Sequence, residues 1–218
     1  MTSIPELRII LAAVESPLVD ASDRFCGDVP FVTVHRRSIL DVPTDAVVSP
    51  ANSYGFMDGG IDALYMSHFG HEIQTRVRRQ IYDHHAGELL VGVADIVETG
   101  HDTIPLLIAA PTMRVPMVLR DSPNAYLAAR AVFLLLQRGS FANGAFAGDR
   151  VADHVRAVAL YLVFELVLRL SLNWRGINAP NSCGCCWQVT SSGMVNWSCR
   201  MSAAPPLLRR SEHENPIN

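Results

Sequence analysis

A glycine pair between an apolar strand pattern and a helical pattern gives this chain its clearest binding chemistry. Residues 49–62 read Ser-Pro-Ala-Asn-Ser-Tyr-Gly-Phe-Met-Asp-Gly-Gly-Ile-Asp. Gly59 and Gly60 let the backbone approach a ligand closely, and the N–H groups in the first turn of a helix have no partner within the helix. Such groups can cradle a phosphate or diphosphate. A tight turn without any ligand uses glycines in the same way, so the glycines by themselves leave both interpretations open.

Other familiar catalytic patterns are missing from the sequence. The 18 cationic residues are all Arg, which excludes a lysine nucleophile or Schiff base. No nucleophile elbow, Walker loop or His-Glu-x-x-His helix is present. We expect no metal and no cofactor, because the late cysteines and the histidine pairs are not spaced as metal ligands. These residues are Cys183, Cys185, Cys186, Cys199, His68, His71, His84 and His85.

The elements expected around the glycine pair alternate between strands and helices. Apolar or alternating patterns predict strands over residues 7–13, 31–35, 45–49, 90–98, 105–110 and 155–160. A stripe with a spacing of four predicts a helix, interrupted at Gly70, through Ile61, Tyr65, Phe69, Ile73, Val77 and Ile81. This order predicts a three-layer α/β/α fold around a mixed, largely parallel sheet. Such sheets bind ligands beyond the carboxyl ends of their strands.

Charge and hydropathy limit the partners that we expect. The net charge is -3 and the sequence pI is about 6.2, which argues against sequence-independent nucleic-acid binding. Arg76, Arg78 and Arg79 lie mostly off the apolar stripe, and we interpret them as a solvated helix face rather than an anion site. The apolar run over residues 160–172 contains Glu165 and Arg169 and is shorter than a membrane helix. We therefore expect a soluble, cytoplasmic protein with no membrane partner.

The glycine loop and its flanks resemble the macro-domain family, whose members bind ADP-ribose. Residues 45–53, Asp-Ala-Val-Val-Ser-Pro-Ala-Asn-Ser, resemble the first strand and loop of that family. Residues 59–63, Gly-Gly-Ile-Asp-Ala, match its glycine run followed by an apolar residue and an Asp. Weaker matches follow at Gly87-Glu88 and at residues 109–112. The resemblance is that of a divergent member and covers about residues 30–160.

The resemblance implies roles for particular residues. Asn52 would orient the ribose next to the modified position, and Asp62 would position or activate a water there as a general base. The diphosphate would meet the N–H groups of Gly59, Gly60 and Ile61, with Ala51 in the same loop. The alternative for Asp62 is structural, because an Asp in the first turn is favoured by the helix dipole whatever the function.

The adenine end of the expected site departs from the family pattern. The family carries an Asp where this chain has Ser38, followed by Ile39, and both residues remain candidates for ligand binding. A serine hydroxyl can accept a hydrogen bond from the adenine amino group, but it carries no charge. That hydrogen bond should therefore be weaker and less selective than the one made by a carboxylate.

The C-terminal part departs further. After residues 155–160 the family has a second glycine-rich loop, whereas this chain continues Tyr-Leu-Val-Phe-Glu-Leu and has no glycine until Gly176. All three tryptophans and four of the five cysteines also follow this point. We divide the chain into a macro-like domain over residues 1–160 and an atypical tail over residues 161–218. A shifted reading frame and a divergent extension both remain open explanations of the tail.

Two hypotheses of function follow. In the first, the chain binds ADP-ribose or a related nucleotide, or an ADP-ribosylated molecule, and hydrolyses an ADP-ribosyl linkage. In the alternative, it is a non-catalytic interaction or structural module that has lost nucleotide turnover. The joint presence of Asn52 and Asp62 favours the enzyme, and the missing second loop favours the alternative. Which linkage or nucleotide is used, and the oligomeric state, are left open by the sequence.

Overall fold

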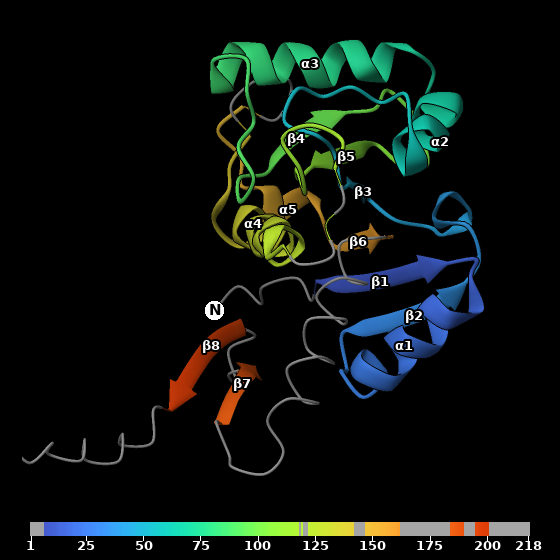
Figure 1. Cartoon of the computed structure of the whole chain (residues 1–218), viewed down its shortest axis with the longest axis vertical. Coiled ribbons are helices and arrows are strands. Elements are labelled where there is room, and N and C mark those ends of the chain that lie inside the picture. Colours follow the sequence, from blue (N-terminus) through green and yellow to red (C-terminus); the bar gives the residue numbers. More distant parts are fainter. Residues whose placement is uncertain are drawn as a thin grey trace, which may run out of the picture. The chain divides into compact units, whose positions relative to one another are not determined.

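The computed structural model describes residues 7–117, 119, 122–141 and 147–161, together with the backbone of residues 184–189 and 195–200 (Figure 1). The chain divides into two compact units, Met1–Trp174 and Arg175–Asn218, and each is described by itself. The domain boundary expected after residue 160 adjoins residues outside the described part, so it stays a prediction. Within the described residues, no helix combines the length and apolar character needed to cross a membrane.

Six described strands of the first unit form one sheet in the order β2-β1-β6-β3-β5-β4. β1 is parallel to β2 and β6, and β3 is parallel to β5 and β6, whereas β4 is antiparallel to β5. The strands are β1 Arg8–Ala13, β2 Val32–Arg36, β3 Ala46–Ser49, β4 Asp95–Glu98, β5 Leu106–Ala109 and β6 Ala157–Leu160. The mixed, largely parallel sheet expected from the sequence is thereby confirmed.

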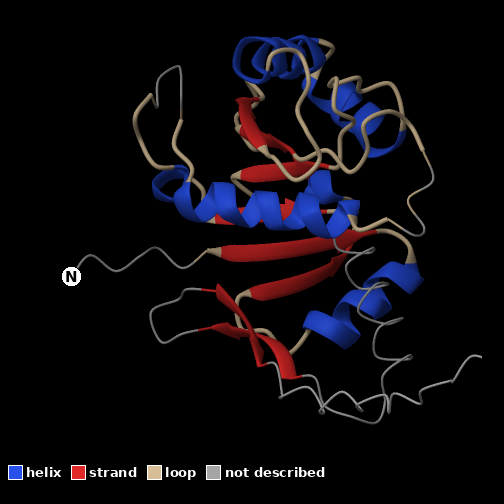
Figure 2. Ribbon diagram, turned by 60° about the vertical axis from the view of Figure 1, so that its left-hand side comes forward, coloured by secondary structure: helices blue, strands red, loops and turns tan. Residues whose placement is uncertain are grey.

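Helices lie on both sides of this sheet (Figure 2). One buried cluster joins alternate residues of the strands, such as Val48 and Ile108, to α4 and α5, with the end of α1 beside them. The other joins the intervening residues, such as Val47 and Leu107, to α2 and α3. The helices are α1 Ser16–Cys26, α2 Gly60–Phe69, α3 Glu72–His85, α4 Asn124–Arg138 and α5 Val151–His154. The result is the three-layer α/β/α fold, because each face of the sheet is apolar and needs its own cover.

The break at Gly70 is where the sequence predicted it. Gly70 ends α2 with φ of 87°, a left-handed value that costs glycine little, and α3 begins two residues later. The apolar stripe continues across the break, since Ile61 and Tyr65 of α2 and Ile73, Val77 and Ile81 of α3 are all buried in the same cluster. One apolar stripe thus anchors two helices on one face of the sheet.

The strand expected over residues 90–98 is shorter than predicted. β4 includes only Asp95–Glu98, because its antiparallel partner β5 offers four residues for pairing. The preceding residues form a loop in which Gly92 has φ of 93°, outside the extended range of a strand. The apolar residues Leu90 and Val93 are accordingly exposed, at 60% and 38%.

The side chain of Asp45 ties β3 to β6 at the start of both strands. Its Oδ2 atom accepts hydrogen bonds from the N–H groups of Arg156 and Ala157, both at 2.8 Å. Two such charge-assisted bonds set the register of β6 beside β3. Because these strands are parallel, their carboxyl ends then meet at the opposite edge, where the glycine loop begins.

The described backbone of the second unit is a pair of antiparallel strands, β7 Gly184–Val189 and β8 Val195–Arg200. Cys183 and the side chains of the other late cysteines lie outside the described residues, as do the tryptophan side chains. The expectation that they hold no metal is therefore not tested.

Candidate functional site

The glycine loop leaves the carboxyl end of β3, between the neighbouring strands β6 and β5. The chain after β5 holds the first half of the loop by backbone hydrogen bonds that extend the pairing of the two strands. The N–H groups of Ala110 and Thr112 donate to the carbonyls of Ser49 and Ala51, at 3.0 Å and 3.1 Å. The N–H of Ser53 donates in turn to the carbonyl of Met113 at 3.0 Å. The loop therefore begins as a fixed continuation of the sheet.

Asn52 organises the middle of the loop through its side chain. The Oδ1 atom accepts from the N–H groups of Tyr54 and Phe56, at 3.1 Å and 3.3 Å. The Nδ2 atom donates one hydrogen to the carbonyl of Phe56 at 2.7 Å. An Asn side chain that bonds to the backbone in this way replaces part of the turn that the backbone would otherwise make. One hydrogen on Nδ2 remains for a further acceptor.

At Gly55 the turn packs closely against α3. It has φ of 69°, and a Cβ atom built on it would lie 2.9 Å from Val77 Cγ1 and 3.0 Å from Ile81 Cδ1. A side chain at residue 55 would therefore need both a left-handed backbone and space that α3 already fills. The loop gains a second point of attachment, independent of Asn52.

The end of the loop is open where the helix starts. Gly59 precedes α2 with an extended φ of -145°, Gly60 has φ of 59°, and a Cβ atom on either would meet nothing within 4 Å. No residue that the structure describes accepts a hydrogen bond from the N–H groups of Gly60, Ile61 or Asp62. These N–H groups carry the positive end of the α2 dipole. An anion can reach them without displacing a protein group.

Asp62 lies in the first turn of α2, but its carboxylate does not cap the helix. The helix is preceded by Gly59 with no side-chain capping bond, and Asp62 Oδ1 instead accepts a hydrogen bond from Ser49 Oγ at 2.5 Å. Asp62 is 7% exposed. Burial raises the pKa of the Asp62 carboxyl from 3.8 to about 6, against the lowering effect of the Ser49 hydrogen bond. The other oxygen, Oδ2, accepts no hydrogen bond from a described residue.

Tyr65 supports this pair from one turn further along α2. Its hydroxyl donates to the carbonyl of Val48 at 3.1 Å, and the side chain is fully buried. Burial, and then the nearby Asp62 carboxylate, raise the pKa of Tyr65 well above its ordinary value. The tyrosine is therefore a neutral hydrogen-bond donor that joins α2 to β3. Its place in the apolar stripe had indicated a core role and gave no sign of this bond.

Hydrogen bonds join the chain just after β6 to the chain just after β1. Tyr161, directly after β6, donates its hydroxyl to the carboxylate oxygens of Glu15, at 3.1 Å and 3.2 Å. Glu15 follows β1, the strand next to β6. The sequence showed that no glycine follows β6, but no sequence pattern indicated the hydrogen bond between Tyr161 and Glu15. The chain immediately after Tyr161, where a second glycine loop would lie, is outside the described residues.

The remaining candidates from the sequence are distributed between surface and core. Ser38 is half-buried, and its Oγ atom accepts from the N–H of Leu40 at 3.3 Å, at the start of the short 3-10 helix η1, Ile39–Asp41. Ala51, Ile39 and Ile61 are 4%, 2% and 5% exposed. Ile39 and Ile61 belong to the same buried cluster. These three residues can meet a ligand only through their backbone, whereas Ser38 keeps a hydroxyl hydrogen to donate.

Two further observations concern metal ligands and buried polar groups among the described residues. They contain no group of three His, Cys, Asp or Glu side chains placed to hold a metal ion. The Ser53 hydroxyl, in a residue 1% exposed, has no hydrogen-bond partner among them. The sequence gave no indication of this buried hydroxyl in the middle of the glycine loop.

No protein-family model matches the chain. An uncharacterised protein of Aquifex aeolicus is 29% identical to it over 110 residues, which are 50% of this chain and 63% of that protein. The chain thus covers less than two thirds of this relative.

Several solved structures are similar to the chain at low sequence identity. The macrodomain of Mycobacterium tuberculosis DarG is 18% identical with a TM-score of 0.46, over 66% of this chain and 90% of that one. A mutant Oceanobacillus iheyensis macrodomain with ADPR is 12% identical with a TM-score of 0.43, over 80% of this chain and 97% of that one. The Oceanobacillus iheyensis macrodomain with ADP is 14% identical with a TM-score of 0.42, over 64% of this chain and 90% of that one. The chain has the three-layer α/β/α fold that its sequence predicted, and the three solved structures named above are macrodomains.

Proposed function

We propose that the first unit binds ADP-ribose or a related nucleotide, with the diphosphate against the start of α2. The observation that carries the proposal is the group of unpartnered N–H donors on Gly60, Ile61 and Asp62 beside an open glycine surface. Donors at a helix start attract anions through both hydrogen bonds and the helix dipole. The loop before them is held by Asn52 and by the chain after β5, so little order has to be gained on binding.

Asn52 is suited to hold the ribose without releasing the loop. Its Nδ2 atom uses one hydrogen for the carbonyl of Phe56, and the second hydrogen is available for a ribose hydroxyl. The resemblance of the loop to the macro-domain pattern supports a position beside the ribose for this amide. We propose the same place here, with Ser38 and the backbone of Ile39 toward the base.

We propose in addition that the chain hydrolyses an ADP-ribosyl linkage. A general base works best with a pKa near the operating pH, and burial brings the pKa of Asp62 to about 6. Ser49 holds Oδ1, which leaves Oδ2 to accept a proton from a water molecule. Asp62 would then polarise a water beside the ribose that Asn52 orients.

The second candidate is a module that binds the nucleotide, or a modified partner, without turnover. The absence of a second glycine-rich sequence after residue 160 favours it, because half of the expected diphosphate cradle would be missing. The two candidates share the binding site and differ only in the role of Asp62. A binding measurement therefore comes before any assay of activity.

Calorimetry of the whole chain with ADP-ribose, ADP and AMP tests the proposal. We expect ADP-ribose and ADP to bind more tightly than AMP, since only they carry a diphosphate. Gly59→Val should weaken ADP-ribose binding by about tenfold or more, because a side chain there blocks the approach to the N–H donors. The extended backbone at Gly59 accepts valine without strain, unlike the left-handed Gly60. Failure of the unmodified chain to bind either diphosphate would refute the proposal.

A further inference from the structure

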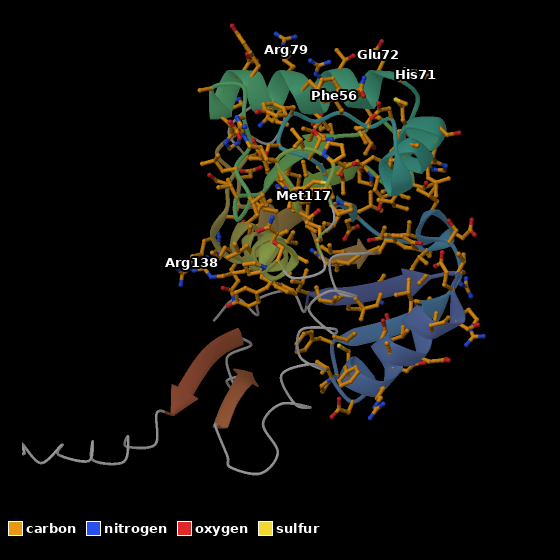
Figure 3. All side chains as sticks on the ribbon, in the orientation of Figure 1. Phe56, His71, Glu72, Arg79, Met117 and Arg138 are labelled. Atoms are coloured by element: carbon orange, nitrogen blue, oxygen red, sulfur yellow. The ribbon has the colours of Figure 1, made fainter. Side chains whose placement is uncertain are left out.

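A hollow lies between residues 54–56 and α3. Its volume is about 430 Å³, within the roughly 300–1,000 Å³ usual for small-molecule sites. Five of its nine lining residues are aromatic or cationic, namely Tyr54, Phe56, Arg78, Arg79 and Tyr82. We call this hollow the α3 groove. Figure 3 labels Phe56 and Arg79 on this side of the molecule, with Arg79 pointing away from the sheet.

Arg78 is placed to meet an anion in this groove. Its guanidinium lies over the Phe56 ring, 4.4 Å from the ring centroid, and no described carboxylate lies within ion-pair distance of it. Arg79 lines the groove beside it and is only loosely engaged by Asp83, at 3.5 Å with both side chains largely exposed. No acidic residue is among those that line the groove. The sequence had indicated a solvated face here, and the side chains are indeed exposed, but two of them also face a concave surface.

The groove also offers planar surfaces to a ligand. Phe56 is 45% exposed and Tyr82 is 75% exposed, so both rings keep surface that a ligand can cover. The outer face of the Arg78 guanidinium extends the stacking surface begun by Phe56. Aromatic rings interleaved with arginines are typical of sites where nucleobases stack beside their phosphates.

Gln74, which also lines the groove, provides a hydrogen-bond donor. Its Oε1 atom accepts from the N–H of Met57 at 2.8 Å, which fixes the orientation of the amide. Its Nε2 atom donates to no described residue. A nucleobase has ring nitrogens and carbonyl oxygens that can accept from this group, whereas a phosphorylated tyrosine ring has none.

We propose that the α3 groove binds a nucleotide unit, with the base stacked on Phe56 and Arg78 and the phosphate held by the two arginines. The unit is either a free mononucleotide or part of a single strand of nucleic acid, since both present the same base and phosphate. The net charge of -3 still argues against binding of long tracts independently of sequence, so the proposal concerns a single nucleotide unit. This proposal does not rest on the function proposed above, because the groove and the open N–H groups of α2 use different residues.

The two sites share one stretch of backbone. Tyr54 and Phe56 line the groove, and the N–H groups of the same two residues donate hydrogen bonds to Oδ1 of Asn52. A ligand in the groove therefore touches the loop that we propose to orient the ribose. A measurement that resolves individual residues is needed to separate the two sites.

Nitrogen-15 NMR titration of the whole chain provides this resolution. With AMP, we expect chemical-shift changes of the amides of Tyr54, Phe56, Gln74 and Tyr82. The midpoint of these changes, the AMP concentration that gives half of the full shift, should differ from the midpoint of any changes at Gly60 and Ile61. A 5′-phosphorylated tetranucleotide that shifts the same amides at a lower midpoint identifies a strand as the source of the unit. An equal or weaker response identifies the free nucleotide.

Three further probes decide the class of ligand. Inorganic phosphate and adenosine should each shift these amides at a midpoint at least about tenfold higher than AMP does. Phosphate that matches AMP would show that the base plays no part and would overturn the proposal. Phosphotyrosine that binds more tightly than AMP would assign the groove to a modified peptide and would also overturn it.

A matched pair of variants tests the role of Arg78. Arg78→Met keeps the aliphatic stem that packs near Gly55 but removes the guanidinium, and it should raise the AMP midpoint by about tenfold or more. Arg76→Met removes the same charge from the same helix, where the guanidinium instead donates to the carbonyl of Glu98, and should leave the midpoint within about twofold. The NMR spectrum of each variant reports whether it is folded. Equal midpoints in the two variants would exclude the α3 groove as the binding site.

Discussion

The hydroxyl of Ser49 donates a 2.5 Å hydrogen bond to Asp62 Oδ1 in the buried junction between β3 and α2. Ser49 is the last residue of β3 and Asp62 lies in the first turn of α2, so the two residues flank the glycine loop. Their hydrogen bond closes the loop at its base and brings a titratable carboxyl to the carboxyl edge of the sheet. The pKa of that carboxyl, about 6, follows mainly from burial.

The pH dependence of stability should reveal this carboxyl. Its pKa is raised on folding from 3.8 to about 6, so the folded chain binds its proton more tightly than the unfolded chain does. The stability contributed by Asp62 is therefore complete below about pH 4 and is lost as the pH rises through 6. Asp62→Asn does not titrate and keeps an acceptor for Ser49. Relative to the unmodified chain, its free energy of unfolding should rise by on the order of 2–3 kcal/mol between pH 4 and pH 8.

Chemical denaturation of both proteins at several pH values measures this difference. Other titrating groups are common to the two proteins and cancel. A difference in free energy of unfolding that stays constant between pH 4 and pH 8 would mean that folding does not raise the pKa of the Asp62 carboxyl. The main argument for Asp62 as a general base would then be wrong.

If the chain hydrolyses an ADP-ribosyl linkage, Asp62→Ala should lower kcat by roughly 10² to 10⁴, the usual loss for a positioned acid or base. The binding of ADP-ribose should change much less, because the N–H donors remain. Asp58→Ala is the control, since Asp58 is an exposed carboxylate of the same loop. Turnover of a labelled ADP-ribosylated substrate measures both. Equal turnover rates for the two variants would show that Asp62 has a structural role and does not act as a base.

Gly60 and Gly70 form a matched pair for the proposed diphosphate site. Both have positive φ, 59° and 87°, and both face open space, so alanine meets no clash at either site and strains each backbone by about 1–3 kcal/mol. Only Gly60 lies beside the unpartnered N–H groups. Gly60→Ala should therefore weaken ADP-ribose binding by about tenfold or more in calorimetry, whereas Gly70→Ala should leave it within about twofold. Comparable affinities would place the diphosphate elsewhere.

The packing of the loop on α3 predicts a large effect at Gly55. Alanine there meets a backbone cost of about 1–3 kcal/mol, because φ is 69°. The clash with Val77 and Ile81 adds about 1–3 kcal/mol of overpacking. Gly92→Ala serves as the control, since φ is 93° but the nearest atom to its Cβ is at 3.7 Å. Urea unfolding should show Gly55→Ala to be the less stable of the two variants, and the reverse order would contradict the observed packing.

The sequence by itself determined the order of the strands and the helical stretch after the glycine loop, but it gave no prediction of α1 or α5. The apolar stripe from Ile61 to Ile81 and the break at Gly70 were readable because helix periodicity and glycine conformation are local properties. The strands were readable for the same reason, apart from β4. Its length depends on how many residues β5 offers for pairing, and no local pattern contains that information.

The tertiary structure decided the chemistry around the glycine loop. The sequence indicated Asp62 as either a base or a residue favoured by the helix dipole, but its pKa depends on Ser49 and on burial between β3 and α2. The α3 groove likewise requires Phe56 and Arg78, which are far apart in the chain, to meet across the turn at Gly55. Hydrogen bonds, stacking and desolvation act between atoms in contact, so such pairs take shape only when the helices pack on the sheet.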